Sequence, residues 1–259
     1  MTGTQASSLR LQEIEQGRIL RVVIEHGKGN VLDRELVAEL TEVLREVARR
    51  ASLRALLIDH AGPHFSYGAS VGEHAPGKVE GFLPEFHALA RALVELPVCS
   101  LAAVRGMCLG GGWELAALAD LVFAAPGASF GQPETKLGVF APIGSALLPR
   151  LAGPRRAADW LLSGRTLSAE EARAAGLVTE LAEDPSVAAL SWARDHLLPK
   201  SASTLGIAVR AARRAWSTPF LAELAELEAL YLGELMATRD AREGIAAFLE
   251  KRDPRWEDR

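Results

Sequence analysis

The chain has 259 residues, of which 49% are hydrophobic and 24% are charged, so we expect a packed globular protein. Its net charge is only −4 and its basic residues form no stripe, which argues against a nucleic-acid partner. No apolar segment reaches the roughly 20 uninterrupted residues that a membrane span needs, and residues 1–8 lack the features of a secretory signal. The two cysteines, Cys99 and Cys108, lack CxxC spacing. The sequence therefore predicts a cytoplasmic protein with reduced cysteines and no membrane partner.

A β-hairpin and a helix are predicted at the start of the chain. Residues 9–14 and 19–24 are two β-rich runs on either side of Gln16-Gly17-Arg18, which is a turn signal. From Asp33, which can cap a helix, the apolar residues follow a helical period. The apolar run at 54–58 then predicts a buried strand.

Strands and helices alternate along the middle of the chain. Helical spacing at 82–93 indicates a helix, and the strand predicted at 98–104 runs directly into the glycine-rich segment 106–112. Residues 113–119 suit a helix, and residues 121–124 suit another strand. This order implies mostly parallel strands with helices packed outside them, which is an α/β fold.

Beyond about residue 199 the strands stop, and three helices are predicted at 204–216, 219–237 and 239–251. The middle helix carries an apolar face too broad for a solvent-exposed helix, made up of Phe220, Leu221, Leu224, Leu227, Leu230, Tyr231 and Leu235. Packing within its own domain and association between subunits both account for this face. We therefore predict two parts, a core domain at 1–198 and a helical oligomerisation region at 199–259.

Two loops that follow predicted strands, 65–70 and 110–115, lie where α/β proteins bind their ligands. The second loop is a glycine run at the start of a helix, where uncovered N–H groups suit a phosphate, a carboxylate or an oxyanion. Glycine-rich turns also serve close packing alone, and this one lacks the spacing of a phosphate loop or a dinucleotide site. The run by itself is therefore weak support for a binding site.

Two glutamates lie close to such loops. Glu114 occupies the first turn of its predicted helix, where the helix dipole alone favours an acidic residue. Glu134 follows Gly131-Gln132-Pro133, and a surface ion pair with Lys136 is the ordinary alternative for it. Neither glutamate on its own indicates catalysis.

Three short segments are informative in combination: Phe65-Ser66-Tyr67-Gly68-Ala69, the run from Gly110 to Glu114, and Gly131-Gln132-Pro133-Glu134. Further segments of the same kind are Asn30-Val31-Leu32, Gly164-Arg165 through Ala172, Gly176-Leu177-Val178 and Phe248-Leu249-Glu250-Lys251-Arg252. Together, in this order and at these separations, they resemble the crotonases, the enoyl-CoA hydratase/isomerase superfamily. The resemblance covers nearly the whole chain.

The resemblance implies a crotonase-like spiral of ββα units with a C-terminal helical region that assembles trimers, commonly paired into hexamers. It implies an acyl-CoA thioester substrate, with coenzyme A entering as part of that substrate and no separate cofactor. The N–H groups of Ala69 and Gly111 would form an oxyanion hole for the thioester carbonyl, while Glu114 and Glu134 would hold a water molecule. The residues expected to contact the substrate or its CoA part are Tyr67, Gly68, Ser70, Gly110, Trp113, Phe140 and Lys251.

Hydration of a conjugated thioester needs such groups for physical reasons. Attack of water on the β-carbon moves negative charge to the thioester oxygen, and fixed N–H donors stabilise it by about 3–4 kcal/mol each. The water must lose a proton and a carbon must gain one, which two carboxyls in unlike protonation states can do. Two neighbouring carboxyls repel each other, so one is kept protonated near neutral pH. Isomerases of the family often keep only one of these glutamates, so the pair favours hydration.

The sequence departs from the common family pattern in three places. Ser70 stands where the family usually has an aspartate, and in Phe140-Ala141-Pro142 the proline is shifted along the chain and preceded by a bulky phenylalanine. Trp113 lies between the glycine run and Glu114. Trp113 either fills core space or narrows the pocket. With Ser70 and Phe140-Ala141-Pro142, the sequence most resembles the hydratases that convert cyclohexa-1,5-diene-1-carbonyl-CoA to 6-hydroxycyclohex-1-ene-1-carbonyl-CoA in anaerobic aromatic degradation. In that reaction the water oxygen adds β to the thioester, and the proton goes to the far end of the diene.

Two other functions are left open by the sequence. The first is a 2-enoyl-CoA hydratase of fatty-acid or branched-acid β-oxidation. The second is a non-catalytic module that binds acyl-CoA, against which the intact glutamates argue. No metal site is expected, because Gly62-Pro63 breaks any helix between His60 and His64. The sequence does not assign which glutamate is the acid.

Overall fold

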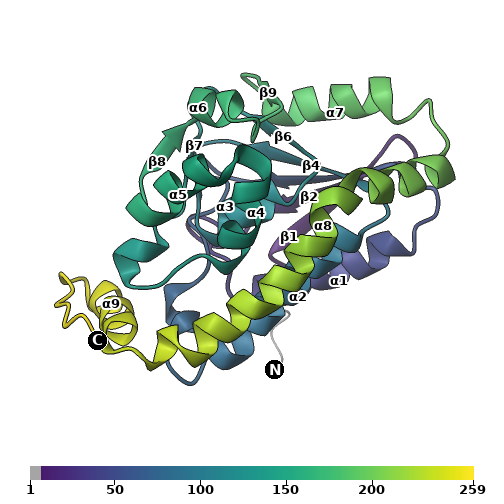
Figure 1. Ribbon diagram of the computed structural model, residues 1–259. Coiled ribbons are helices and arrows are strands. Elements are labelled where there is room, and N and C mark those ends of the chain that lie inside the picture. The colour runs from purple at the N-terminus through teal and green to yellow at the C-terminus, as the bar shows by residue number, and fades with distance from the viewer. Residues whose placement is uncertain (1–6) are drawn as a thin grey trace, which may run out of the picture.

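The computed structural model describes residues 7–259. The segment 1–8, in which we expect no secretory signal, lies mainly outside the described residues. The larger sheet has the strand order β1-β2-β3-β4-β6-β9. Its strands are β1 (Leu9–Ile14), β2 (Ile19–Ile24), β3 (Ala55–His60), β4 (Cys99–Val104), β6 (Leu121–Ala124) and β9 (Glu180–Leu181). β1 and β2 form an antiparallel hairpin, and the other neighbours pair in parallel. The predicted hairpin and the mostly parallel α/β arrangement are confirmed (Figure 1).

A second, smaller sheet lies beside the first. It has the order β5-β7-β8 and consists of β5 (Met107–Leu109), β7 (Ser129–Gly131) and β8 (Thr166–Ser168). The strand predicted at 98–104 forms as β4 and leads into the glycine-rich segment 106–112 as expected, but this segment turns at Gly106 and contains the further strand β5, which begins at Met107. Gly106 has a φ of +59° and no room for a Cβ against the Pro63 carbonyl, so glycine suits this turn.

Helices cover both faces of the larger sheet. The α-helices are α1 (Arg34–Ala48), α2 (Val79–Glu95), α3 (Gly111–Ala117), α4 (Pro142–Ala152), α5 (Pro154–Ser163), α6 (Ala169–Ala174), α7 (Pro185–His196), α8 (Ala202–Gly233) and α9 (Arg239–Glu250). Three short 3-10 helices are η1 (Val71–His74), η2 (Glu134–Leu137) and η3 (Leu235–Ala237). As predicted, Asp33 caps α1, because its carboxylate accepts the Leu36 N–H at 3.0 Å.

The alternation of side chains along β3 divides the core between two layers. Leu56 and Ile58 are buried in the cluster that includes apolar residues of α1 and α2. Ala55 and Leu57 face the other way, into a cluster that includes residues of α7. Figure 1 shows α7 on the opposite side of the sheet from α1 and α2. All six residues of β3 are therefore buried, as expected for a central parallel strand.

The prediction of separate helices at 204–216 and 219–237 is wrong. Residues 202–233 form the single helix α8, which contains Pro219. A proline inside a helix costs about 3 kcal/mol, but packing holds both halves of α8 in place. Arg213, on the first half, pairs with Asp120 and is buried, and Phe220 and Leu224, on the second half, are buried in the main core.

The apolar face of α8 packs largely within its own chain. α8 contacts both α2 and α4, and it crosses in front of α2 in Figure 1. Tyr231 joins a further cluster with Val79 and Leu83 of α2, whereas Leu230 remains 40% exposed. Across residues 7–259, none of the helices combines the length and the apolar character that crossing a membrane requires.

Candidate active site

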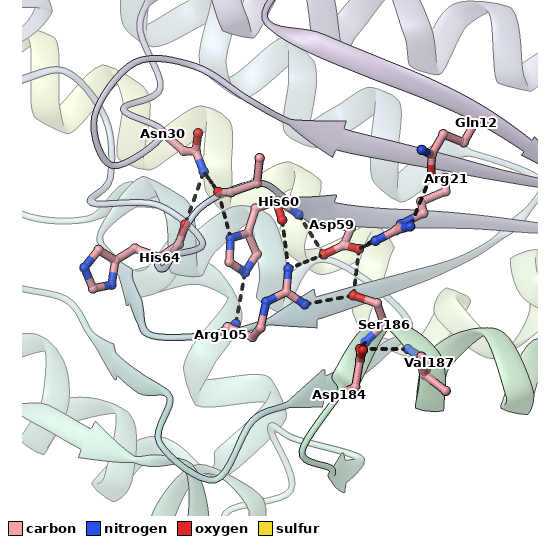
Figure 2. A network of polar contacts seen from close by, with 11 residues as sticks. Gln12, Arg21, Asn30, Asp59, His60, His64, Arg105, Asp184, Ser186 and Val187 are labelled. Atoms are coloured by element: carbon pink, nitrogen blue, oxygen red, sulfur yellow. Dashed lines mark hydrogen bonds and ion pairs between the residues drawn. The ribbon is translucent and has the colours of Figure 1, made fainter.

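A buried polar network fixes the end of β3, from which the first loop departs (Figure 2). Asp59 is inaccessible to solvent and accepts hydrogen bonds from Ser186 Oγ at 2.7 Å and Arg105 Nη2 at 3.1 Å. Burial alone would raise the pKa of Asp59, but hydrogen bonds from Ser186, the His60 N–H and Arg21 hold it below its usual value. The charged network thus ties β2, β3 and α7 together beneath the loop.

Asn30 and Ser66 set the conformation of the loop itself. Asn30 Nδ2 donates to the carbonyls of Ala61 at 3.2 Å and His64 at 3.1 Å, as Figure 2 shows. Ser66 Oγ donates to the Asn30 carbonyl at 2.7 Å and accepts the Gly68 N–H at 3.0 Å. The Ser66 hydroxyl therefore fixes the backbone just before the residue expected to supply the oxyanion-hole N–H.

His60, the last residue of β3, and His64, in the loop that follows, both have structural partners. His60 Nε2 accepts the Arg105 N–H at 3.2 Å, and His64 Nδ1 accepts the Met107 N–H at 3.1 Å. Burial and the nearby Arg105 charge lower the pKa of His60 to about 4, so its ring is neutral. Over the described part of the chain, no group of three His, Cys, Asp or Glu side chains is arranged to hold a metal ion.

The two glycine-containing loops touch, and their free N–H groups lie side by side. A Cβ at Gly111 would lie 3.1 Å from the Ala69 nitrogen, and one at Gly68 would lie 2.9 Å from the Leu109 carbonyl oxygen. Within residues 7–259, neither the Ala69 N–H nor the Gly111 N–H donates a hydrogen bond. Two such donors, side by side, can bind one developing oxyanion.

Glu114 lies in the first turn of α3 and is only 4% exposed. Its Oε1 accepts the N–H of Gly144 at 2.7 Å, so the start of α4 holds the carboxyl in place. Burial raises the pKa of Glu114 to about 7, although the N–H groups of Gly144 and Ile143 partly offset this by favouring the charged form. Glu114 can therefore exchange a proton near neutral pH.

Glu134 begins η2, and its carboxyl lies against the second loop. A Cβ at Gly110 would be 2.7 Å from Glu134 Oε1. With its amide nitrogen turned towards Glu134, Gln132 donates to both carboxyl oxygens at 3.0 Å. Burial raises the pKa of Glu134 well above its ordinary value, and the negative charge of Glu114 raises it further. The two carboxyls therefore act on each other, and Glu134 is the one that keeps its proton more readily.

The remaining residues singled out by the sequence lie in different surroundings. Phe140 and Glu134 line one cavity of about 250 Å³. Ser70 occupies the position before η1, next to Ala69, and its side chain makes no capping hydrogen bond there. Tyr67 is 42% exposed, with its ring 5.0 Å from that of His64.

Trp113 and Lys251 differ from each other in burial. Trp113 is buried, with its ring centroid 5.9 Å from that of Phe130 and 6.0 Å from that of Trp160, which favours the interpretation that it fills core space. Lys251 ends α9 in the left-handed conformation and is exposed.

Sequence reasoning did not assign roles to three residues of this site. Ser66 and Gln132 lie inside the recognised segments, close in sequence to Gly68 and Glu134. Their polar side chains could have indicated that they hydrogen-bond to these two residues, as the structure shows. Tyr231 gave a different signal, since it is a polar residue on an otherwise apolar helix face. Its contact with the site depends on how α8 packs, which the local sequence does not specify.

The paired carboxyls beside two free N–H groups are the arrangement of an enzyme that protonates and deprotonates an activated thioester. The sequence matches the enoyl-CoA hydratase/isomerase family over residues 15–259, and the chain belongs to that family.

Individual relatives agree with this membership. The chain is 47% identical over 254 residues to the cyclohexa-1,5-dienecarbonyl-CoA hydratase of Thauera aromatica, covering 98% of both chains. It is 36% identical over 231 residues to a probable enoyl-CoA hydratase of Mycobacterium bovis, covering 88% of this chain and 89% of the other. The crystal structure of an enoyl-CoA hydratase/isomerase from Pseudoalteromonas atlantica superposes with a TM-score of 0.85 at 29% identity, covering 96% of this chain and 100% of the other. The expected crotonase fold is therefore confirmed.

Proposed function

We propose that this chain hydrates cyclohexa-1,5-diene-1-carbonyl-CoA to 6-hydroxycyclohex-1-ene-1-carbonyl-CoA, a step in anaerobic aromatic degradation. The observation that carries the proposal is the 47% identity, over 98% of both chains, with the Thauera hydratase. The site suits the reaction, because two carboxyls with raised pKa values lie near two unpartnered N–H groups. The chain is accordingly a hydro-lyase.

The thioester carbonyl accepts hydrogen bonds from the N–H groups of Ala69 and Gly111. Support for this role comes from their closeness and from the absence of other partners for them within residues 7–259. As water attacks, the electron pair of the conjugated system moves onto the thioester oxygen, and both hydrogen bonds strengthen. Each such donor lowers the barrier by about 3–4 kcal/mol.

Glu114 is the base and Glu134 is the acid. Glu114 receives the Gly144 N–H, which favours its carboxylate form, whereas the charge of Glu114 favours the protonated form of Glu134. Glu114 takes a proton from the water as the oxygen bonds to the β-carbon. Glu134 then gives its proton to the far end of the diene as the enolate collapses, and solvent restores the starting protonation states.

The proposal includes the surroundings of the reaction. The substrate is an acyl-CoA ester and no separate cofactor is required, because the chain's own groups supply both proton transfers and the charge stabilisation. We propose a cytoplasmic homotrimer or hexamer in which Lys251 meets the nucleotide part of CoA. The free buried cysteines Cys99 and Cys108 support the reducing compartment, and the exposed Leu230, Phe248 and Leu249 near the C-terminus support subunit association. The division of the chain into a core domain at 1–198 and a helical oligomerisation region at 199–259 stays a prediction.

A 2-enoyl-CoA hydratase of β-oxidation is the second candidate, and the relationship to the Mycobacterium bovis protein favours it. The idea of a non-catalytic binding module loses support, because the relatives named above are hydratases and both carboxyls remain.

The deciding experiment compares hydration of cyclohexa-1,5-diene-1-carbonyl-CoA and crotonyl-CoA by the purified protein. We expect kcat/KM to be higher for the cyclic diene by about 100-fold, which corresponds to roughly 2.7 kcal/mol of transition-state discrimination. Activity on crotonyl-CoA alone would transfer the assignment to β-oxidation. Binding of both esters without turnover of either would point to a binding module.

A further inference from the structure

Tyr231 carries a hydroxyl group that the fold buries without a partner. The residue lies on α8 and its exposed fraction is 0%. Within residues 7–259, its Oη and Nε2 of His87 are the buried side-chain polar atoms that lack a hydrogen-bond partner. His87 already uses its other ring nitrogen, 2.6 Å from Glu228 Oε2. Tyr231 has no such second contact, so its whole hydrogen-bonding capacity is unused.

The ring of Tyr231 is held between the two segments that flank the candidate active site. Its centroid lies 5.3 Å from that of Phe140, which follows η2, and 6.2 Å from that of His74, which ends η1. η1 begins directly after the Ala69 loop, and η2 begins with Glu134. Tyr231 therefore approaches the site from α8, beside the residues that follow Ala69 and Glu134.

The hydroxyl also lies within electrostatic reach of both carboxyls. Burial raises the pKa of Tyr231, and the negative charges of Glu134 and Glu114 raise it further. The phenol is therefore neutral throughout the working range of the enzyme and remains able to donate a hydrogen bond. Neither carboxyl forms a direct hydrogen bond with it, so the hydroxyl is free to bind a small polar molecule.

We propose that Tyr231 is a positioning residue whose hydroxyl holds the reacting water, and then the hydroxyl group that this water becomes on the product. A buried water needs two to four polar partners, and Tyr231 adds a third partner to Glu114 and Glu134. The inference rests on the proposed hydration. Tyr231 keeps its own proton: the water proton goes to Glu114, the oxygen bonds to the β-carbon, and Glu134 protonates the diene.

A purely structural role would leave a different signature in the stability of the protein. An unpartnered buried hydroxyl is unfavourable for folding, so removing it should not weaken the fold. Tyr231→Phe keeps the ring and its contacts with Phe140 and His74. We therefore expect the midpoint of thermal unfolding to stay the same or to rise, while catalysis declines.

The test measures turnover of wild type and Tyr231→Phe, and their affinities for two esters that differ only in one hydroxyl. These probes are 6-hydroxycyclohex-1-ene-1-carbonyl-CoA and cyclohex-1-ene-1-carbonyl-CoA. We expect kcat to fall about tenfold or more, binding of the hydroxylated ester to weaken about tenfold, and binding of the other ester to change less than about twofold. Trp216→Phe, which alters the same helix beside Phe220, is the control and should leave turnover unchanged.

Several results would overturn the inference. Unchanged turnover in Tyr231→Phe, or equal weakening of both esters, would remove Tyr231 from the site, and a lower unfolding midpoint would identify a structural role instead. The pair 3-hydroxybutyryl-CoA and butyryl-CoA gives the same comparison if the substrate is a linear enoyl-CoA. Failure of the proposed hydration is separately visible, because wild type itself would then hydrate neither cyclohexa-1,5-diene-1-carbonyl-CoA nor crotonyl-CoA.

Discussion

A Cβ atom at Gly110 would lie 2.7 Å from Oε1 of Glu134, so the absence of a side chain at one position makes room for the carboxyl at the other. The relationship explains why the second loop needs glycine at this position. Gly110 also has a φ of +50°, where L side chains are disfavoured. Its N–H donates to the Gly131 carbonyl at 2.8 Å, which joins the loop to the strand that leads to Glu134.

Gly110→Ala should therefore impair catalysis more than folding. The added methyl group displaces the Glu134 carboxyl, and we expect kcat to fall about 100-fold, at the lower end of what loss of a general acid costs. The positive φ adds a stability loss of about 1–2 kcal/mol. Steady-state kinetics and urea unfolding measure the two effects. Gly127→Ala is the matched control, because a Cβ there meets nothing within 4 Å, and it should alter neither quantity. A Gly110→Ala enzyme with normal kcat would disprove the spatial relationship.

Replacing either carboxyl by its amide should abolish most turnover and preserve ester binding. Glu114→Gln removes the proposed base and Glu134→Gln the proposed acid, and each loss is expected to lower kcat by roughly 10²–10⁴. Both amides keep the shape of the site, so the Kd for a saturated acyl-CoA should change little. Calorimetric titration beside rate measurements separates the two quantities. Full turnover in either variant would exclude that residue from proton transfer.

Local sequence was sufficient for those features whose cause is local. The turn at Gln16-Gly17-Arg18 and the Asp33 cap depend on neighbouring residues, and both form as predicted. The loops that bring Ala69 and Gly111 together were recognisable because their segments are short and contiguous. Their close approach, however, depends on which strands are neighbours and in what register they pair, and the alternation of strands and helices predicts only that the pairing is mostly parallel.

Features caused by distant contacts were not predictable. Pro219 signals the end of a helix, but α8 continues because Arg213 and Phe220 anchor its two halves to the body. Gly106 lies inside an apolar and glycine-rich run, so the sequence gives no sign that a second sheet begins after it. The position of Tyr231 near the carboxyls likewise depends on the packing of α8, about 100 residues after Glu134 in the chain.

Ser66→Ala should weaken the oxyanion-hole loop. The hydroxyl connects the Asn30 carbonyl with the Gly68 N–H, and its removal leaves that buried N–H unpaired at a cost of about 1–3 kcal/mol. Because the Ala69 N–H follows directly, we expect kcat to fall about tenfold, less than for loss of a complete donor. Ser163→Ala, at an exposed helix end, should leave both values unchanged. A stability loss with unaltered kcat would separate the loop from catalysis.

Glu114 should make the folded protein less stable as the pH rises. Burial raises its pKa to about 7 from an ordinary 4.5, so between these values the folded state binds more protons than the unfolded state. The contribution of the group to stability is therefore complete below pH 4.5 and is lost as the pH rises through 7. At about 1.4 kcal/mol per pH unit, the loss amounts to as much as roughly 3 kcal/mol.

Glu114→Gln removes this titration and keeps an oxygen that can accept the Gly144 N–H. Urea unfolding at pH 5 and pH 8.5 gives the difference in unfolding free energy between the variant and wild type. We expect this difference to be about 1–3 kcal/mol more favourable to the variant at pH 8.5 than at pH 5. Glu46→Gln, on an exposed side chain of α1, is the control and should show no such difference between the two pH values. The burial that weakens the fold is also what keeps Glu114 ready to exchange a proton near neutral pH. An equal change in stability at both pH values would therefore contradict the proposed basis of catalysis as well.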